Sequence, residues 1–147
     1  MTGTVLYDVR RAHGAGEMEQ LLELRHEVFC REQGVPEHEE TDGRDHDAVH
    51  LVAVREGRVI ATCRVLLVGP TAQLSRLAVA SAERRRGIAT ALLEAAEDEA
   101  RAGGGRRLVL HAQTYARELY DRVGYRARGR TFIEAGIEHI AMEKPLG

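Results

Sequence analysis

Three consecutive arginines connect a strand pattern to a helical pattern in this sequence. Aliphatic residues stand in near alternation over residues 72–79, which is typical of a strand. Helix formers with apolar residues three and four apart follow over residues 87–102. The sequence therefore predicts a strand, a tight connection through the arginines at 84–86, and a long helix.

The start of that helix favours a bound anion. Its first backbone N–H groups have no acceptor within the helix, and three arginines at the positive end of the helix dipole need a compensating charge. Gly87 has no Cβ to hold an anion away from the backbone. We expect a phosphate cradle, with an ordinary surface arginine cluster as the alternative. The cradle residues are Arg84, Arg85, Arg86, Gly87, Ile88, Ala89 and Thr90.

Bulk properties predict one domain over residues 1–147. A 44% hydrophobic and 30% charged composition is ordinary for a globular protein, and a net charge of −2 gives no reason to expect nucleic acid. No apolar run reaches the roughly 20 residues of a membrane span, and no secretory signal opens the chain. Cys30 and Cys63 form no CxxC pair. We expect both to be small buried hydrophobes in a reducing, cytoplasmic setting, without membrane contact.

The rest of the chain alternates strand and helix patterns. Strands are predicted at 5–11, 48–55, 58–68, 72–79, 107–113, 125–133 and 137–144. Helices are predicted at 16–33, 87–102 and 115–123, with a polar loop at 37–47. Antiparallel strands followed by a strand–helix–strand unit predict an α+β fold with a mixed sheet.

These features resemble the GNAT superfamily of acyl-CoA-dependent N-acyltransferases. The family's acyl-CoA motif, Arg/Gln-x-x-Gly-x-Gly/Ala, is matched by Arg84, Gly87 and Ala89. A helix ending in Leu-Tyr before Gly-aromatic is matched by residues 119–125. The resemblance implies a mostly antiparallel sheet of about six to seven strands flanked by helices. The small ElaA-like branch is the closer resemblance, through residues 25–36, 40–42, Asp45, His50, 111–113 and 136–142.

The resemblance implies that acetyl-CoA is a co-substrate. The cradle would hold its pyrophosphate. The strand Leu77, Ala78 and Val79 would splay open, so that its backbone N–H groups bind pantetheine and the acyl carbonyl. The family's asparagine before the second helix is replaced here by Gln113-Thr114, and Gln113 is expected at the pantetheine contact.

Acyl transfer also needs an acid and a base. Tyr120 is the expected general acid for the departing thiolate, with a tyrosine packed against the sheet as the alternative. His50 and Glu40 are alternative general bases, although a lone strand histidine is also typical of a core. His111 faces either the core or the cofactor cleft, and the sequence leaves both open.

The acidic segment 37–47 allows three interpretations. It is a solvated loop, a rim that attracts a cationic amine, or a metal site. The segment lacks the calcium-loop pattern, and its two histidines lack ligand spacing, so we expect no metal. Its acidic and histidine residues are Glu37, His38, Glu39, Glu40, Asp42, Asp45, His46 and Asp47.

Together these features predict an N-acetyltransferase that moves an acetyl group from acetyl-CoA to a primary amine by direct transfer. The acceptor would be a small molecule or a peptide, and family members often pair as homodimers through strands near the C terminus. A non-catalytic acyl-CoA-binding sensor or regulatory module is the alternative. Residues 25–32 also resemble the start of acyl-homoserine-lactone synthases, but those chains are longer.

Overall fold

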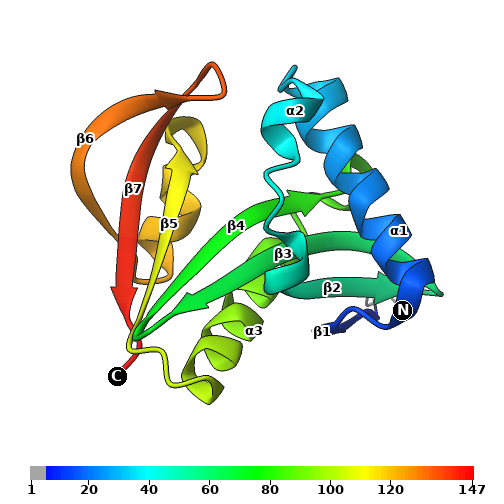
Figure 1. Cartoon of the computed structure of the whole chain (residues 1–147), viewed down its shortest axis with the longest axis horizontal. Coiled ribbons are helices and arrows are strands. Elements are labelled where there is room, and N and C mark those ends of the chain that lie inside the picture. The colour runs from blue at the N-terminus through cyan, green and yellow to red at the C-terminus, as the bar shows by residue number, and fades with distance from the viewer. Residues whose placement is uncertain (1–5) are drawn as a thin grey trace.

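The computed structural model describes residues 6–147, which form one mixed sheet flanked by helices (Figure 1). The strand order is β1-β2-β3-β4-β5-β7-β6. Neighbouring strands are antiparallel except for the parallel pair β4 and β5. This confirms the predicted α+β class. The strands are β1 (Asp8–Arg11), β2 (Val49–Arg55), β3 (Arg58–Val68), β4 (Thr71–Val79), β5 (Arg107–Gln113), β6 (Arg126–Glu134) and β7 (Ile137–Pro145).

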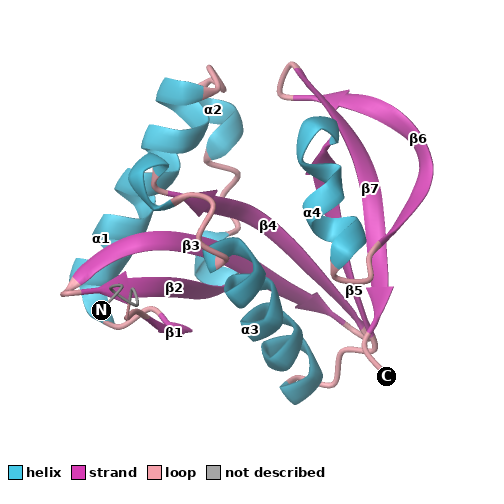
Figure 2. Cartoon of the chain, turned by 180° about the vertical axis from the view of Figure 1, so that it is seen from behind, coloured by secondary structure: helices cyan, strands magenta, loops and turns pink. Residues whose placement is uncertain are grey.

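Helices cover both faces of the sheet. On one face lie α1 (Gly14–Arg25) and the single turn α2 (Glu37–Glu40), in front of the strands in Figure 1. On the other face lie α3 (Ile88–Ala102) and the short α4 (Arg117–Arg122), which stand in front in Figure 2. We call these the α1/α2 face and the α3/α4 face.

The strands β4 and β5 pair over only part of their length. Their parallel ladder runs from Thr71 opposite Arg107 to Leu74 opposite Leu110. Beyond it, β4 continues along β3 and β5 continues along β7, so the sheet divides into two arms (Figure 1). We call the space between these diverging strand ends the fork. It is the opening that the resemblance implies for Leu77 to Val79.

An extra residue in β4 marks the start of the fork. The pairing register with β3 shifts between Thr62 and Arg64, opposite the stretch from Ser75 to Ala78. Arg76 within this stretch has φ +56°, which is uncommon for a residue with a side chain. A β-bulge of this kind bends its strand, and here it lies where β4 leaves β5.

Apolar packing fixes both arms onto the helices. The larger cluster lies on the α3/α4 face, where α3 residues such as Leu92 and Leu93 pack against strand residues such as Leu74, Leu108 and Met142. Smaller clusters join α1 to the α1/α2 face. They contain Leu21 with Val52 and Val54, and Leu24 with Val28 and Ala78.

Several predicted boundaries differ from the structure. The first strand begins at Asp8, and the predicted start at residue 5 lies outside the described residues. The predicted helix 16–33 is an α-helix that changes at His26 into a π-helical segment, His26–Glu32. Apolar spacing does not separate these two helix types over so few turns. The predicted helix 115–123 is α-helical only from Arg117, after a 3₁₀ turn.

Candidate active site and cofactor cleft

A cavity of about 210 Å³ lies at the N-terminus of α3, beside the end of β4. Gly87 is the N-cap of α3 with φ +79°, and a Cβ there would meet open space. Glycine is therefore favoured at this position by the left-handed backbone conformation and not by steric crowding. The lining residues are Val79, Glu83, Arg84, Arg85, Gly87, Ile88, Ala89, Thr90 and Leu119.

The first turn of α3 offers open donors to this cavity. No side chain caps the helix, and the first helical bond runs from the Ala91 N–H to the Gly87 carbonyl. The N–H groups of Ile88, Ala89 and Thr90 therefore have no acceptor in the helix. The positive end of the dipole adds to their attraction for an anion.

The three arginines differ in their surroundings. Arg84 donates to the Glu32 carboxylate at 2.9 and 3.0 Å and to the Val79 carbonyl at 3.0 Å. Arg86 lies 3.6 Å from Glu83 and does not line the cavity. Arg85 lines the cavity and makes no ion pair with any residue of 6–147. Arg84 and Arg86 therefore have part of their compensating charge within the protein, from Glu32 and Glu83, and the assignment of all three arginines to the phosphate cradle stays a prediction.

The end of β4 forms one wall of the fork. Leu77 and Val79 pack toward the large core, whereas Ala78 is buried against Leu24 and Val28 on the opposite face. Because pairing with β5 ends at Leu74, the backbone edge that faces the fork has no ladder partner. Its polar groups are available to a bound chain of amides such as pantetheine.

Gln113 joins the two arms across the fork. Its side-chain amide donates to Gln33 Oε1 at 2.9 Å, and Gln33 lies at the end of the π-helical segment. The Gln33 amide also lies 3.4 Å from the Tyr115 hydroxyl. Gln113, the expected pantetheine contact, is thus one of two hydrogen-bonded side-chain amides that connect β5 to the α1/α2 face.

Tyr120 projects from α4 into the large core, and 8% of it is exposed. Its ring meets Tyr125 edge to face, with centroids 6.1 Å apart. Burial raises the pKa of Tyr120 to about 12, so the phenol is neutral at physiological pH and can donate but not accept a proton. Within residues 6–147, the side-chain polar atoms that are buried without a hydrogen-bond partner belong to His26 and Glu83. The Tyr120 hydroxyl has no partner among these residues but is not one of those buried atoms, so it reaches the surface.

A network of buried charges holds the acidic segment. The Arg25 side chain, 1% exposed, donates to both Glu40 oxygens at 2.6 and 3.2 Å and to Asp45 at 2.8 Å. Arg64, 3% exposed, donates to Asp42 at 2.7 and 2.8 Å and to Asp45 at 3.0 Å. Most of residues 37–47 are exposed, as a solvated loop requires, but Glu40 is buried. The carboxylates of Glu40, Asp42 and Asp45 neutralise buried arginines and are not free to form an acidic rim.

The same network connects the acidic segment to the bulge. Arg76 donates to the Glu40 carbonyl at 2.7 Å and lies 3.4 Å from the Asp42 carboxylate. The Arg64 guanidinium lowers the pKa of Asp42 well below its usual range. The position of α2 is thus fixed relative to the strand that opens the fork.

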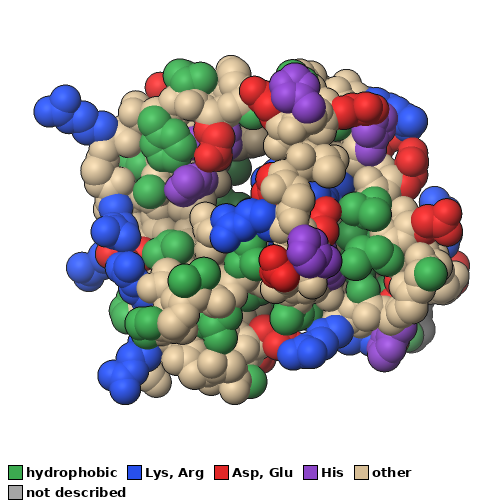
Figure 3. Space-filling model, in the orientation of Figure 1, with side chains coloured by type: hydrophobic (Ala, Val, Ile, Leu, Met, Phe, Trp, Pro, Cys, Tyr) green, Lys and Arg blue, Asp and Glu red, His purple; other side chains and the backbone are tan. Residues whose placement is uncertain are grey.

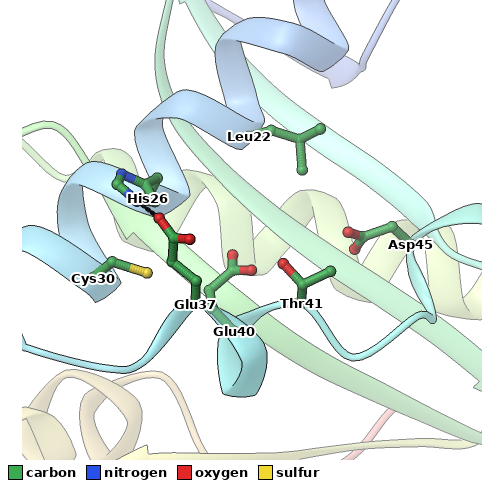
Figure 4. Close-up of a pocket in the computed structure, with 7 residues that line it drawn as sticks. All are labelled: Leu22, His26, Cys30, Glu37, Glu40, Thr41 and Asp45. Carbon is green, nitrogen blue, oxygen red and sulfur yellow. Dashed lines mark hydrogen bonds and ion pairs between the residues drawn. The ribbon is translucent and has the colours of Figure 1, made fainter.

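A second cavity, of about 280 Å³, lies between α1 and the acidic segment (Figure 4). His26 Nε2 lies 2.7 Å from Glu37 there. Cys30 faces the same cavity, and burial together with the Glu40 and Glu37 charges raises its pKa, so it is a neutral thiol. Cys63 is fully buried, whereas Cys30 is only partly so. The lining residues are Leu22, His26, Cys30, Glu37, Glu40, Thr41 and Asp45.

The two predicted bases lie in different surroundings. Glu40 lines the second cavity with its carboxylate bonded to Arg25. His50 is buried, lines neither cavity, and places Nε2 2.7 Å from the Asp45 carbonyl. Both thus contact the arginine–carboxylate network of the acidic segment, Glu40 through Arg25 and His50 through the Asp45 backbone. Their catalytic role stays a prediction.

Sequence reasoning gave no role to Glu32, Gln33 or Arg76. The first two lie in the motif 25–36 that carries the ElaA-like resemblance, but their partners Arg84 and Gln113 stand 52 and 80 residues away in the chain. Such pairs leave no local periodicity. Arg76 could have been noticed in the sequence, because it is a positive charge within an apolar strand pattern.

The chain belongs to the GNAT acetyltransferase family: the model of the acetyltransferase (GNAT) domain matches residues 13–146. It is 31% identical over 129 residues to a Bacillus subtilis (strain 168) protein named as the uncharacterized N-acetyltransferase YjcF, covering 87% of this chain and 92% of YjcF.

Solved structures share this fold. An acyl-CoA N-acyltransferase from Pseudomonas aeruginosa superposes with a TM-score of 0.82 at 31% identity, covering 96% of this chain and 99% of that one. Escherichia coli ElaA superposes with a TM-score of 0.83 at 22% identity, covering 95% of this chain and 99% of ElaA. At 22% identity, this likeness supports the fold but does not show that the chain belongs to the ElaA-like branch.

Among residues 6–147, none of the helices is long and apolar enough to cross a membrane. The same residues contain no group of three or more His, Cys, Asp or Glu placed to hold a metal ion.

Proposed function

We propose that this protein is an N-acetyltransferase that transfers an acetyl group from acetyl-CoA to a primary amine of a small molecule or peptide. The observation that carries the proposal is the fork between β4 and β5, placed directly beside the open N-terminus of α3. The anion-binding donors and the unpaired strand edge are thus adjacent. An acyl-CoA needs both, because its pyrophosphate and its pantetheine arm bind as one extended chain.

The residues present fit this co-substrate. Arg85 and the open N–H groups of Ile88 to Thr90 would hold the pyrophosphate in the 210 Å³ cavity. The free edge of β4 would bind the pantetheine amides and place the thioester carbonyl against the backbone of Leu77 to Val79. The Gln33–Gln113 pair would exchange one of its bonds for a pantetheine amide.

Direct transfer requires the amine nitrogen to attack the thioester carbon while the C–S bond breaks. The amine loses one proton to a base, and the departing thiolate receives one from an acid. Tyr120 lies on the α3/α4 face and its hydroxyl reaches the surface, so it would donate to the sulfur. Because burial raises its pKa to about 12, far above a thiol near 8.5, a hydrogen bond to the developing thiolate is its main contribution.

The proposal extends to the setting of the protein. We propose one domain over residues 1–147, a place in the ElaA-like branch on the motifs at 25–36 and 136–142, and a cytoplasmic location. Two free cysteines support a reducing compartment. A homodimer through the C-terminal strands is consistent with β6 standing at the edge of the sheet.

A thiol-release assay with acetyl-CoA tests the function against polyamines, aminoglycosides, amino acids and peptide N-termini. With an active amine, Tyr120→Phe should lower kcat about 100-fold and leave the Kd for CoA within about twofold. Tyr7→Phe is the matched control and should retain wild-type kcat. If CoA binds but no amine releases thiol, the sensor alternative replaces the enzyme.

A further inference from the structure

His111 is the first residue of β5 beyond the ladder with β4. The last parallel pair is Leu74 with Leu110, so His111 lies where the fork opens. Its neighbours Leu110 and Ala112 are buried in the large core on the α3/α4 face. Because side chains alternate along a strand, His111 projects from the α1/α2 face, where 41% of its side chain is exposed.

The ring of His111 is held by groups from the neighbouring strands. Nδ1 lies 3.0 Å from Oε1 and 3.3 Å from Oε2 of Glu134, on β6. Phe132 meets the imidazole edge to face at 5.0 Å, and His139 of β7 stacks on Phe132 at 5.9 Å. Figure 3 shows this face hollowed between the arms, with histidine and acidic side chains beside the hollow.

The pairing with Glu134 decides which nitrogen of His111 carries a lone pair. A carboxylate only accepts hydrogen bonds, so Nδ1 donates to it, and in the neutral ring Nε2 is left as the acceptor. The charge of Glu134 also stabilises the imidazolium that forms when Nε2 takes a proton. His139 also belongs to this cluster: it is buried, lies 2.7 Å from the Ile137 carbonyl through Nδ1, and lies 3.9 Å from Glu134. Arg128 of β6 pairs with Ala141, the β7 partner of His111, and lies 3.4 Å from Glu143.

We propose that His111 is the general base for the acceptor amine and that Glu134 is the residue that positions it. This rests on the proposed acetyltransferase function. The amine enters from the α1/α2 face, and its nitrogen bonds to the thioester carbon while His111 Nε2 takes its proton. The C–S bond breaks toward the α3/α4 face, where Tyr120 donates to the thiolate. Solvent then removes the proton from His111 and supplies one to the thiolate, while Tyr120 keeps its own.

The other two bases are already engaged by the protein. Glu40 shares its charge with a buried arginine, and the Nε2 of His50 points at a backbone carbonyl. His111 alone of the three combines an exposed ring, a carboxylate that orients it, and a position at the fork. This arrangement also separates acid and base onto opposite faces of the sheet, so that neither competes for the other's proton.

Kinetics with an amine from the thiol-release assay test the base directly. His111→Gln should lower kcat/KM at least 100-fold, abolish the acidic limb of its pH profile, and leave the Kd for CoA within about twofold. Glu134→Gln should lower kcat/KM about 10-fold, mainly through kcat. The control is His46→Gln, whose side chain is 78% exposed and distant in sequence from the fork. A His111→Gln enzyme with the wild-type rate and profile would overturn the proposal.

A second measurement is independent of turnover. In ¹⁵N-detected imidazole spectra of the wild-type protein, His111 should be the Nδ1–H tautomer, and Glu134→Gln should shift it toward Nε2–H. A wild-type Nε2–H tautomer overturns the base assignment even if the enzyme is active. Conversely, an Nδ1–H tautomer without turnover of any amine leaves the dyad supported and places the failure in the proposed function.

Discussion

Arginine and carboxylate pairs occur at two places around the fork, and they serve opposite purposes. On the α1/α2 face, Arg25 and Arg64 are nearly inaccessible and each bonds two carboxylates. At the start of α3, Arg84 and Arg86 are about half exposed and each has one carboxylate, while Arg85 is turned to a cavity. The first cluster satisfies itself and supports the fold. The second keeps positive charge where a ligand can reach it.

Removing one member of the buried cluster should have the largest effect. Arg25→Met leaves the Glu40 carboxylate buried without its partner, and we expect a loss of about 3–5 kcal/mol in the free energy of unfolding. Urea denaturation monitored by circular dichroism measures it. The double variant Arg25→Met/Glu40→Gln should recover part of the loss, because the stranded charge is also removed.

The matched control for this prediction is Arg31→Met. Arg31 pairs with Glu27 one helical turn away, and both side chains are more than half exposed. An exposed pair of this kind contributes less than about 0.5 kcal/mol. Equal losses from the two substitutions would show that burial is not what distinguishes the clusters.

Acid should weaken the buried cluster through Asp42. Arg64 lowers the pKa of Asp42 in the folded protein, so its stabilisation is present above the ordinary aspartate pKa near 4 and is lost as the pH falls below it. Asp42→Asn should cost about 2 kcal/mol at pH 7, the size of hydrogen bonds to a charged group. Urea midpoints of both proteins between pH 7 and pH 2 should converge toward acid. Parallel curves would contradict the assignment.

The two arginine clusters also differ in how far the sequence could predict them. Strand 107–113 was predicted with both of its bounds because alternating apolar residues follow three glycines. The residues around Arg85, Gly87 and Thr90 were predicted to lie together because they are neighbours in the chain and share one helix end. Residues that are close together in the chain form a spacing pattern that can be recognised in the sequence.

The ion pairs of the acidic segment could not be predicted, for the opposite reason. The carboxylates of Glu40 and Asp42 are surrounded by polar residues in sequence, yet their partners come from α1 and β3, 15 and 22 residues away. Whether a carboxylate is solvated or buried depends on those partners. His111 was undecided for a related reason, because strand alternation defines two faces but gives no contact with Glu134.

The smallest expected effects are those of single arginines in the exposed cluster on the Kd for CoA. Arg85→Ala should raise the Kd for CoA about fivefold, close to 1 kcal/mol, because Arg85 lines the cavity and has no protein carboxylate in the described part of the chain. Arg86→Ala should change the Kd about twofold or less, since Arg86 lies outside the lining and faces Glu83. Arg130→Ala, an exposed arginine of β6 outside the cavity lining, is the control. Calorimetric titrations at low and high salt should show the Arg85 contribution shrinking as ions screen it. If Arg86→Ala weakens binding as much as Arg85→Ala, its ion pair with Glu83 opens when CoA binds, and both arginines belong to the phosphate cradle.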